Sequence, residues 1–211
     1  MKIAIVGATG AVGSRLTAEA TNRGHRVTAL ARSRNREKSL PPQVPLCIVE
    51  ADTTDAMVEV FHGHDVVLVA TRPRSGQESG ITNTTRSMLD AAASAGVRIV
   101  FVGGSAPLRT PDDPTRRVLD DPRYVQAAWR TIARASADQL AACEDHTANW
   151  TYLSPPALLQ PGTRTGSYHR GTDQLLIDEH GTSSISMEDL AVAVLDEAET
   201  PHAARHFTIR N

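Results

Sequence analysis

The sequence has few cysteines, few lysines and no long apolar segment, and each scarcity excludes a class of protein. Its two cysteines, Cys47 and Cys143, lie far apart in apolar surroundings, so we expect core thiols rather than a disulfide or a metal pair. No apolar run approaches the roughly 20 residues needed to span a bilayer. The N-terminus is typical of a β-strand and not of an export signal. We therefore expect a cytoplasmic protein that does not bind membranes.

The sequence also lacks a basic excess. Its 211 residues contain 22 Lys and Arg against 24 Asp and Glu, a net charge of −2. Binding a nucleic acid over a surface requires an excess of positive charge, so no nucleic-acid partner is expected. Internal repeats and low-complexity tracts are absent, and the length suits one domain over residues 1–211.

The most informative motif lies at the N-terminus. An apolar run over residues 3–6 predicts a buried strand, and glycines follow at Gly7, Gly10 and Gly13. The next residues have the apolar spacing of a helix, at Val12, Leu16 and Ala20. Free N–H groups and the positive end of the helix dipole suit a pyrophosphate at such a turn. The Gly-x-x-Gly-x-x-Gly spacing differs by one residue from the dinucleotide fingerprint; a tight structural turn is the alternative.

Strand and helix patterns alternate through the first hundred residues. Further strands are predicted over 26–31, 46–50, 65–70 and 98–102, with helices over about 55–61 and 77–95. Five apolar strands separated by helices indicate an α/β protein with a Rossmann-type, doubly wound parallel sheet covered on both faces.

Beyond residue 103 the pattern becomes less regular. Four prolines and many charges over 106–122 predict a lid loop, and residues 155–185 predict a small substrate-binding portion. Further elements are predicted as helices over about 123–145 and 187–198 and as strands over 150–154, 173–177 and 206–210. Ser186 is expected to cap the last helix, with Asp189 completing a capping box.

The end of the second strand decides the choice of cofactor. An acidic residue there selects NAD, whereas cations accommodate the 2′-phosphate of NADP. Residues 31–36 contain three arginines, and the first carboxylate is that of Glu37. Arg32 is suited to stack on adenine or to fork onto the phosphate, and Ser33 to donate a hydrogen bond. The sequence thus predicts NADP, with NADPH preferred over NADH; a solvated basic turn is the alternative.

Other strand ends supply further candidates, because ligands bind at the carboxyl edge of such sheets. Asp52 follows the third strand, where it either meets the adenine amino group or caps the next helix. Thr71 and Arg72 follow the fourth strand. Gly104 and Ser105 follow the fifth, and Ser105 either faces the nicotinamide as a catalytic residue or forms an ordinary turn.

The most familiar catalytic pair of such enzymes is missing. Short-chain dehydrogenases use Tyr-x-x-x-Lys, and Lys2 and Lys38 are the only lysines. The residues four positions after Tyr124, Tyr152 and Tyr168 are Ala128, Pro156 and Thr172. Any proton must therefore come from another group.

Three further patterns concern metal binding, hydrolysis and the substrate pocket. His62 and His64 stand in a turn without a second ligand pair, so no metal is expected. Ser105 is outside a Gly-x-Ser-x-Gly elbow, which disfavours a hydrolase. Tyr168 and His169 either line the substrate pocket or lie exposed in a loop.

The chain resembles the atypical short-chain dehydrogenase/reductases of the NAD(P)H-binding type, a group that includes biliverdin reductase B, a flavin reductase, and the nitrogen-metabolite repressor-like proteins. The resemblance covers the whole chain and is carried by residues 7–13, 103–105, 150–157 and 185–191.

This resemblance implies a role for each matching residue. The pyrophosphate would be held by Thr9, Gly10, Ala11 and Val12, the 2′-phosphate end by Arg32 and Ser33, and the adenine by Asp52. The nicotinamide ribose and ring would be surrounded by Thr71, Ser105, Pro155, Pro156 and Ala157.

The sequence predicts an NADPH-dependent reductase of a flat conjugated acceptor, such as a quinone, a flavin or a polycyclic aromatic ketone. Hydride transfer would depend chiefly on proximity and orientation, with Ser105 or water delivering the proton. A non-catalytic, NADP-binding redox sensor is the alternative, and an epimerase or dehydratase is disfavoured by the missing Tyr-x-x-x-Lys pair. Both a monomer and a homodimer are compatible with the sequence.

Overall fold

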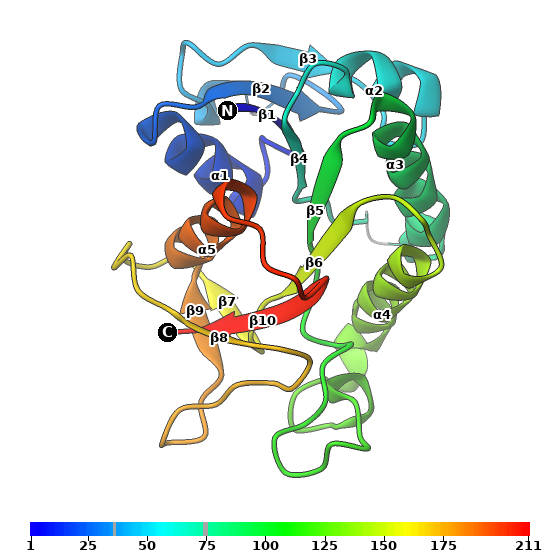
Figure 1. Cartoon of the computed structure of the whole chain (residues 1–211). Helices are drawn as coiled ribbons and strands as arrows, with labels where there is room; N and C mark the ends of the chain where they lie inside the picture. Colours follow the sequence, from blue (N-terminus) through cyan, green and yellow to red (C-terminus); the bar gives the residue numbers. More distant parts are fainter. Residues whose placement is uncertain (36, 74–75) are drawn as a thin grey trace.

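Parallel strands form the centre of the molecule. The computed structural model describes residues 1–35, 37–73 and 76–211. One sheet has the order β3-β2-β1-β4-β5-β6-β10-β8, in which only the pairing of β10 with β8 is antiparallel (Figure 1). Its strands are β1 Lys2–Val6, β2 Arg26–Ala31, β3 Leu46–Ile48, β4 Val66–Val69, β5 Arg98–Val102, β6 Trp150–Ser154, β8 His169–Gly171 and β10 His206–Arg210. A separate parallel pair joins β7 Leu158–Gln160 to β9 Ser184–Ser186.

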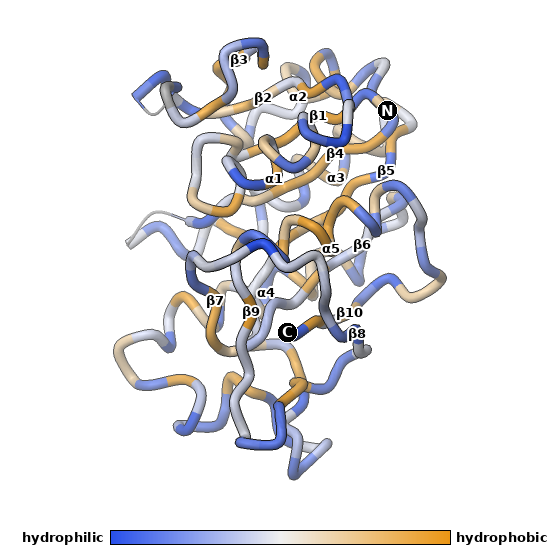
Figure 2. Tube along the Cα trace, turned by 90° about the vertical axis from the view of Figure 1, so that its left-hand side faces the viewer, coloured by the Kyte–Doolittle hydropathy of each residue, from blue (hydrophilic) through white to orange (hydrophobic). Residues whose placement is uncertain are grey.

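Helices cover both faces of this sheet. On one face lie α1 Ala11–Asn22 and α5 Met187–Glu199, and on the other α2 Thr54–Phe61, α3 Ile81–Ala95 and α4 Arg130–Glu144 (Figure 1). Short 3₁₀ turns are η1 Glu37–Ser39, η2 Glu78–Gly80, η3 Val118–Asp120 and η4 Ala127–Trp129. An apolar cluster fills each interface between helices and sheet. Figure 2 shows the apolar residues along the central strands and hydrophilic residues in the peripheral loops.

The predicted fold class is confirmed, because its signal was local. Ile3, Ala4 and Ile5 are all fully buried, so the strand is apolar at successive positions and not at alternate ones. The strands predicted over 26–31, 98–102, 150–154 and 206–210 have these bounds in the structure. Ser186 caps α5, since its Oγ accepts from the Asp189 N–H at 2.9 Å.

Two predicted elements were wrong. The helix expected from residue 123 becomes α-helical only at Arg130, because Gln126 is extended, with a ψ of 156°, and separates the turn at Asp121 from η4 and α4. The strand expected over 173–177 is reduced to one isolated bridge between Gln174 and Arg109, and the third strand ends two residues early.

Residues 106–122 pack on a small core of their own. Leu108 and Val118 are fully buried against Leu175, and Tyr124 and Val125 cover this cluster. The segment is therefore tied to the body of the protein by apolar contacts as well as by its bridge at Arg109.

Both cysteines are free thiols, as expected. Cys143 is buried on α4, where desolvation raises its pKa to about 12, and Cys47 is partly buried. Over residues 1–35, 37–73 and 76–211, no helix is long and apolar enough to cross a membrane.

Gly103 provides a test of the packing at the end of β5. A Cβ at this position would lie 1.8 Å from the hydroxyl of Tyr152, a fully buried side chain. That hydroxyl donates to the Ser136 carbonyl at 3.0 Å, so the Tyr152 ring cannot move away from a new methyl group without losing this bond. We expect Gly103→Ala to lower the free energy of unfolding by about 1–3 kcal/mol, the usual cost of overpacking, as measured by urea denaturation.

Gly80→Ala is the matched control for this substitution. Gly80 has a φ of −78°, and nothing lies within 4 Å of the position that a Cβ would take there. The stability of this variant should therefore change by less than about 1 kcal/mol. Equal stability of the two variants would contradict the packing argument.

Candidate functional site

The glycine loop after β1 forms a cradle at the point where the strand order reverses. Gly7 has a φ of +81°, a conformation that favours glycine. Its N–H and that of Ala8 both donate to the Leu30 carbonyl, at 2.9 and 3.1 Å. A Cβ on Gly7 would lie 2.6 Å from the Ala70 carbonyl oxygen, so the loops after β1 and β4 are in direct contact.

The start of α1 is equally close to the loop. A Cβ on Gly13 would lie 2.1 Å from the Gly7 carbonyl oxygen, and one on Gly10 would lie 3.1 Å from the same atom. The bond from Ser14 N–H to the Gly10 carbonyl opens the helical ladder, so the N–H groups of residues 11–13 lie in the first turn, outside it. Gly10 has a φ of −76°, which any residue adopts. Its lack of a side chain therefore matters for space and not for backbone conformation.

Thr71 borders this cradle from the end of β4. Its Cγ2 lies 3.2 Å from the position that a Cβ on Gly7 would take. Its Oγ1 is buried without a hydrogen-bond partner among the described residues. A buried hydroxyl without a partner is costly, so this atom is suited to a ligand group at the switch point. Arg72, the next residue, is exposed.

The ends of β2 and β3 present exposed polar side chains. Arg34 is paired with Glu37 at 2.8 Å, whereas Arg32 has no ion pair with a described residue. Ser33 is exposed beside it, and Arg36 lies outside the described residues.

Asp52 follows β3 and is not the cap of the next helix. Thr53 occupies the N-cap position of α2, and its side chain makes no capping hydrogen bond. The exposed Asp52 carboxylate is therefore left at the same edge of the sheet.

The residues after β5 form a close helix contact and an ordinary turn. A Cβ on Gly104 would lie 2.5 Å from Ser136 Oγ, so this glycine allows α4 to approach the end of β5. Ser105 forms an ordinary turn through its backbone, since its carbonyl accepts from Leu108 N–H at 3.0 Å. Its side chain is half-buried, and the hydroxyl has no hydrogen bond to a described residue.

Strand β6 places its own end next to that of β5. Gly103 N–H donates to the Leu153 carbonyl at 2.9 Å. Pro155 and Pro156 follow as buried residues, and Ala157 is exposed. The carboxyl edge thus brings together the glycine loop, Thr71, Ser105 and the 155–157 segment on adjacent strands.

Sequence reasoning missed a set of contacts that fixes the loop over residues 161–167. Asp189 does not complete a capping box; its carboxylate accepts from Thr165 N–H and Gly166 N–H, both at 2.8 Å. Glu188 accepts from Gly162 N–H at 2.7 Å and from Arg15 Nε at 2.6 Å. The two acidic residues indicated only a helix start in the sequence, because the loop that they bind is some 25 residues away.

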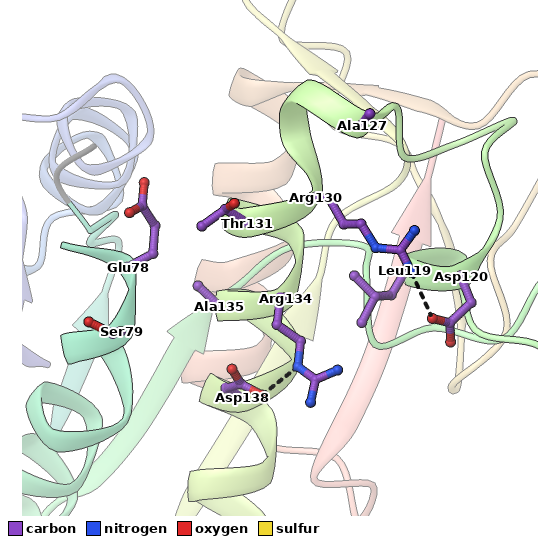
Figure 3. A pocket seen from close by; sticks show the side chains of 10 residues that line it. All are labelled: Glu78, Ser79, Leu119, Asp120, Ala127, Arg130, Thr131, Arg134, Ala135 and Asp138. Atoms are coloured by element: carbon purple, nitrogen blue, oxygen red, sulfur yellow. Dashed lines mark hydrogen bonds and ion pairs between the residues drawn. The ribbon is translucent and has the colours of Figure 1, made fainter. Parts of the chain in front are cut away.

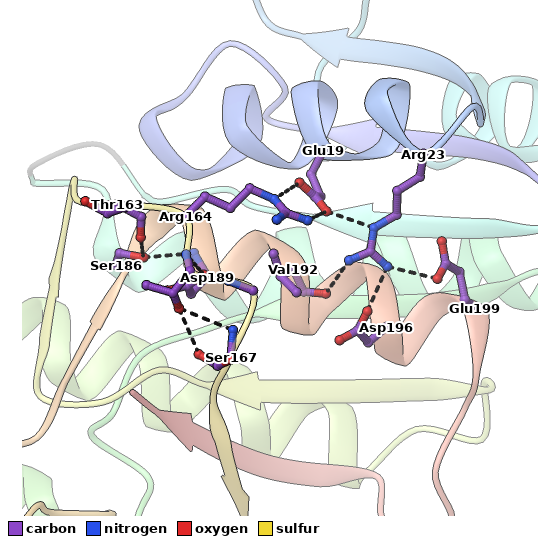
Figure 4. Close-up of polar contacts among 12 residues, drawn as sticks. Glu19, Arg23, Thr163, Arg164, Ser167, Ser186, Asp189, Val192, Asp196 and Glu199 are labelled. Atoms are coloured by element: carbon purple, nitrogen blue, oxygen red, sulfur yellow. Dashed lines mark hydrogen bonds and ion pairs between the residues drawn. The ribbon is translucent and has the colours of Figure 1, made fainter.

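A buried carboxylate on α1 also binds the loop over residues 161–167. Glu19 accepts two hydrogen bonds from Arg164 at 2.8 Å and one from Arg23 at 2.8 Å (Figure 4). The hydrogen bonds from Arg164 lower the Glu19 pKa most, and the bond from Arg23 lowers it further. Together they outweigh burial, which raises this pKa, and hold it at about 2. The latch, made of Arg15, Glu19, Arg164, Glu188 and Asp189, therefore joins α1 and α5 to the predicted substrate-side portion.

Tyr168 belongs to this packing and not to an open pocket. Its hydroxyl donates to Asp196 on α5 at 2.9 Å, and burial raises its pKa to about 12. His169, the next residue, is exposed in β8.

A groove of about 620 Å³ lies on the α4 side of the sheet, next to residues 106–122 (Figure 3). Its walls include Leu119 and Ala135, and the Leu119 N–H donates to the carbonyl of Ala106, the residue after Ser105. The Arg134 guanidinium on its rim is paired with Asp138 at 3.2 Å. None of the predicted cofactor residues lines this groove.

The described ranges contain no group of three or more His, Cys, Asp or Glu side chains placed to hold a metal ion. His64 is instead engaged through Nε2 with Thr28 Oγ1 at 2.9 Å.

The chain matches a family model described as NAD(P)H-binding, over residues 7–201. It is 33% identical to protein YwnB of Bacillus subtilis, itself uncharacterized, over 99% of this chain and 98% of that protein. A structure from Burkholderia pseudomallei, assigned by prediction as an exported protein, has 35% identity, a TM-score of 0.87 and full coverage of both chains. Protein SP1627 of Streptococcus pneumoniae, assigned by prediction as an NADH-flavin reductase, has 27% identity and a TM-score of 0.88, with 100% and 99% coverage.

The latch generates a prediction about pH. Because the Glu19 pKa is depressed, its ion pairs stabilise the fold fully above about pH 4.5, and this contribution is lost as the pH falls through about 2. Arg164→Ala should lower the free energy of unfolding by about 1 kcal/mol at pH 7, a value discounted for the half-exposed arginine. The deficit should shrink at pH 2, as measured by urea denaturation at both pH values.

Arg134→Ala is the control, because Arg134 forms an exposed pair within α4. A deficit of the Arg164 variant that is the same at pH 7 and pH 2 would show that the Glu19 carboxylate is not its cause.

Proposed function

Because the chain belongs to the NAD(P)H-binding family, we propose that it is an NADPH-dependent reductase that transfers hydride to a flat conjugated acceptor, such as a quinone, a flavin or a polycyclic aromatic ketone. The family and the reductase-like neighbours support an oxidoreductase. The observation that carries the proposal is the glycine turn before α1: its three glycines allow close backbone contacts, and the N–H groups of residues 11–13 stay outside the helical ladder.

The cradle fits the pyrophosphate of a dinucleotide. The first-turn N–H groups of α1 are suited to donate to phosphate oxygens, and the helix dipole adds favourable charge. In the proposed complex the pyrophosphate lies against residues Thr9, Gly10, Ala11, Val12 and Gly13. The Thr71 hydroxyl, which has no partner among the described residues, would form a hydrogen bond to the cofactor.

The adenosine end is proposed to lie over the ends of β2 and β3. Arg32, which no carboxylate neutralises among the described residues, would bind the 2′-phosphate together with Ser33. Asp52 would accept from the adenine amino group. This charge pattern favours NADPH over NADH, although the pneumococcal relative has been assigned to NADH.

The nicotinamide end is proposed to lie between Thr71 and Arg72 on one side and Gly104, Ser105 and residues 155–157 on the other. When bound, NADPH supplies the hydride. The protein holds the nicotinamide ring against the acceptor ring and excludes water. The Ser105 hydroxyl is free to donate a proton or a hydrogen bond to the acceptor.

The acceptor is proposed to lie beside the groove in Figure 3, with residues 106–122 acting as a lid and residues 155–185 forming the opposite side. A small aromatic or quinone-like molecule suits this place, because delocalisation of the incoming charge reduces the need for a strong acid. Burial of Tyr152 raises its pKa far above the ordinary value, and Tyr168 is held by Asp196, so neither phenol is suited to replace Ser105. A cytoplasmic monomer or homodimer is the proposed form.

A second candidate function is a redox sensor that binds NADP without turnover and regulates a partner. The missing Tyr-x-x-x-Lys pair favours it. Tight NADPH binding without oxidation over a panel of quinones, flavins and aromatic ketones would select the sensor.

The choice of cofactor is tested at Arg32. Arg32→Glu should weaken NADPH binding by roughly 10- to 100-fold, the value of one or two charge-assisted hydrogen bonds, and should leave NADH binding within a few-fold. Isothermal titration calorimetry with both cofactors measures this.

Arg34→Glu is the control in the same turn, because Arg34 already pairs with Glu37. Equal affinity of the unmutated protein for NADPH and NADH would remove the assignment to NADP.

The proton-donating role is tested at Ser105. Ser105→Ala should slow single-turnover NADPH oxidation at saturating acceptor by roughly 10- to 100-fold, since one hydroxyl hydrogen bond to developing charge is worth about 1–3 kcal/mol. NADPH affinity should stay within a few-fold.

Ser105→Thr keeps the hydroxyl and should restore most of the rate. A rate that is unchanged in the alanine variant would exclude Ser105 from the reaction.

A further inference from the structure

A second groove of about 610 Å³ lies at the amino-terminal edge of the sheet, opposite the proposed cofactor site. It is formed by the starts of β1 and β2, the segment before β3 and the turn between α2 and β4. The residues of its walls that carry charge or hydrogen-bonding groups include Lys2, His25, Arg26, Gln43, His62 and His64. No aspartate or glutamate is among these residues.

Two cations are placed side by side in this groove. Lys2 and Arg26 are register partners on the adjacent parallel strands β1 and β2, which are about 4.8 Å apart. Both side chains are exposed, and neither has an ion pair with a described residue. Adjacent like charges repel each other, and a bound anion would relieve this repulsion.

The turn of His62 and His64 adds imidazole groups to the same wall. His64 is oriented by the contact of its Nε2 with Thr28 Oγ1 at 2.9 Å. Its Nδ1 is buried and has no partner among the described residues. The φ of +77° at Gly63 allows the tight turn that brings both histidines to the groove.

Two carboxylates contact groove residues without lining the groove themselves. Asp65 accepts from the backbone N–H of Lys2 at 2.7 Å, and Glu199 contacts His25 Nε2 at 2.6 Å. The walls of the groove thus contain the cations Lys2 and Arg26 and no carboxylate.

We propose that this groove binds a small anion with two or more negative charges, carried by phosphate or carboxylate groups. Lys2 and Arg26 supply the charge, and the buried Nδ1 of His64 and the Gln43 side chain supply hydrogen-bonding groups. The volume is that of a small-molecule site. The site is independent of the proposed reductase activity, because it lies at the other edge of the sheet.

Histidine side-chain ¹H–¹⁵N spectra of the full chain test this proposal. Pyrophosphate is titrated at constant ionic strength, with sodium chloride as the reference. We expect saturable shifts of the His62 and His64 ring signals. Lys2→Gln and Arg26→Gln should each weaken binding by roughly fivefold, the value of one charge at about 4 Å in water. Arg86→Gln, which removes an exposed arginine on α3, should leave binding unchanged.

A parallel titration with citrate identifies the anion chemistry: tighter pyrophosphate binding assigns phosphate groups, and tighter citrate binding assigns carboxylates. Because pyrophosphate also suits the glycine loop, amide signals of Gly7 and Gly10 are followed in the same samples. Shifts confined to the loop, ring shifts equal to those in sodium chloride, or unchanged binding in both Gln variants would overturn the proposal.

Discussion

The close contact between the start of α1 and the end of β1 is the constraint on which the rest of the site depends. The Gly7 carbonyl lies where a Cβ of Gly13 would be, and the Gly7 backbone lies against the Ala70 carbonyl. Three chain segments therefore converge within van der Waals distance at the switch point. The N–H groups of residues 11–13 lie outside the helical ladder at this place, and Thr71 and Ser105 follow neighbouring strands at the same edge of the sheet.

The features that were predicted correctly are those encoded within a few consecutive residues. An apolar run such as residues 99–102 of β5 indicates a strand buried on both faces, and the Ser186 cap is visible in a single turn of sequence. The glycine triplet was equally informative: Gly10 and Gly13 face the Gly7 carbonyl inside one strand–turn–helix unit, whereas Gly7 faces the Ala70 carbonyl after β4. At Asp52 the structure excludes only the capping role, because Thr53 is the N-cap residue of α2.

The features that were not predicted depend on residues far apart in sequence. Asp189 resembled a capping residue because its true partners, the amides of Thr165 and Gly166, are more than 20 positions away. The helix start at residue 123 was wrong because the chain is extended at Gln126, a break that helix propensity does not reveal. Pairing of Glu19 with Arg164 crosses most of the chain and has no sequence signature.

The latch also bears on how such a scaffold diversifies. Glu19, Glu188 and Asp189 stand on two helices of the Rossmann body, and they grip the 161–167 loop mostly through its backbone amides and one arginine. Main-chain recognition places little demand on the other side chains of the loop. Descendants of this chain are therefore free to exchange the loop's outward-facing residues while the loop stays bound to the same carboxylates.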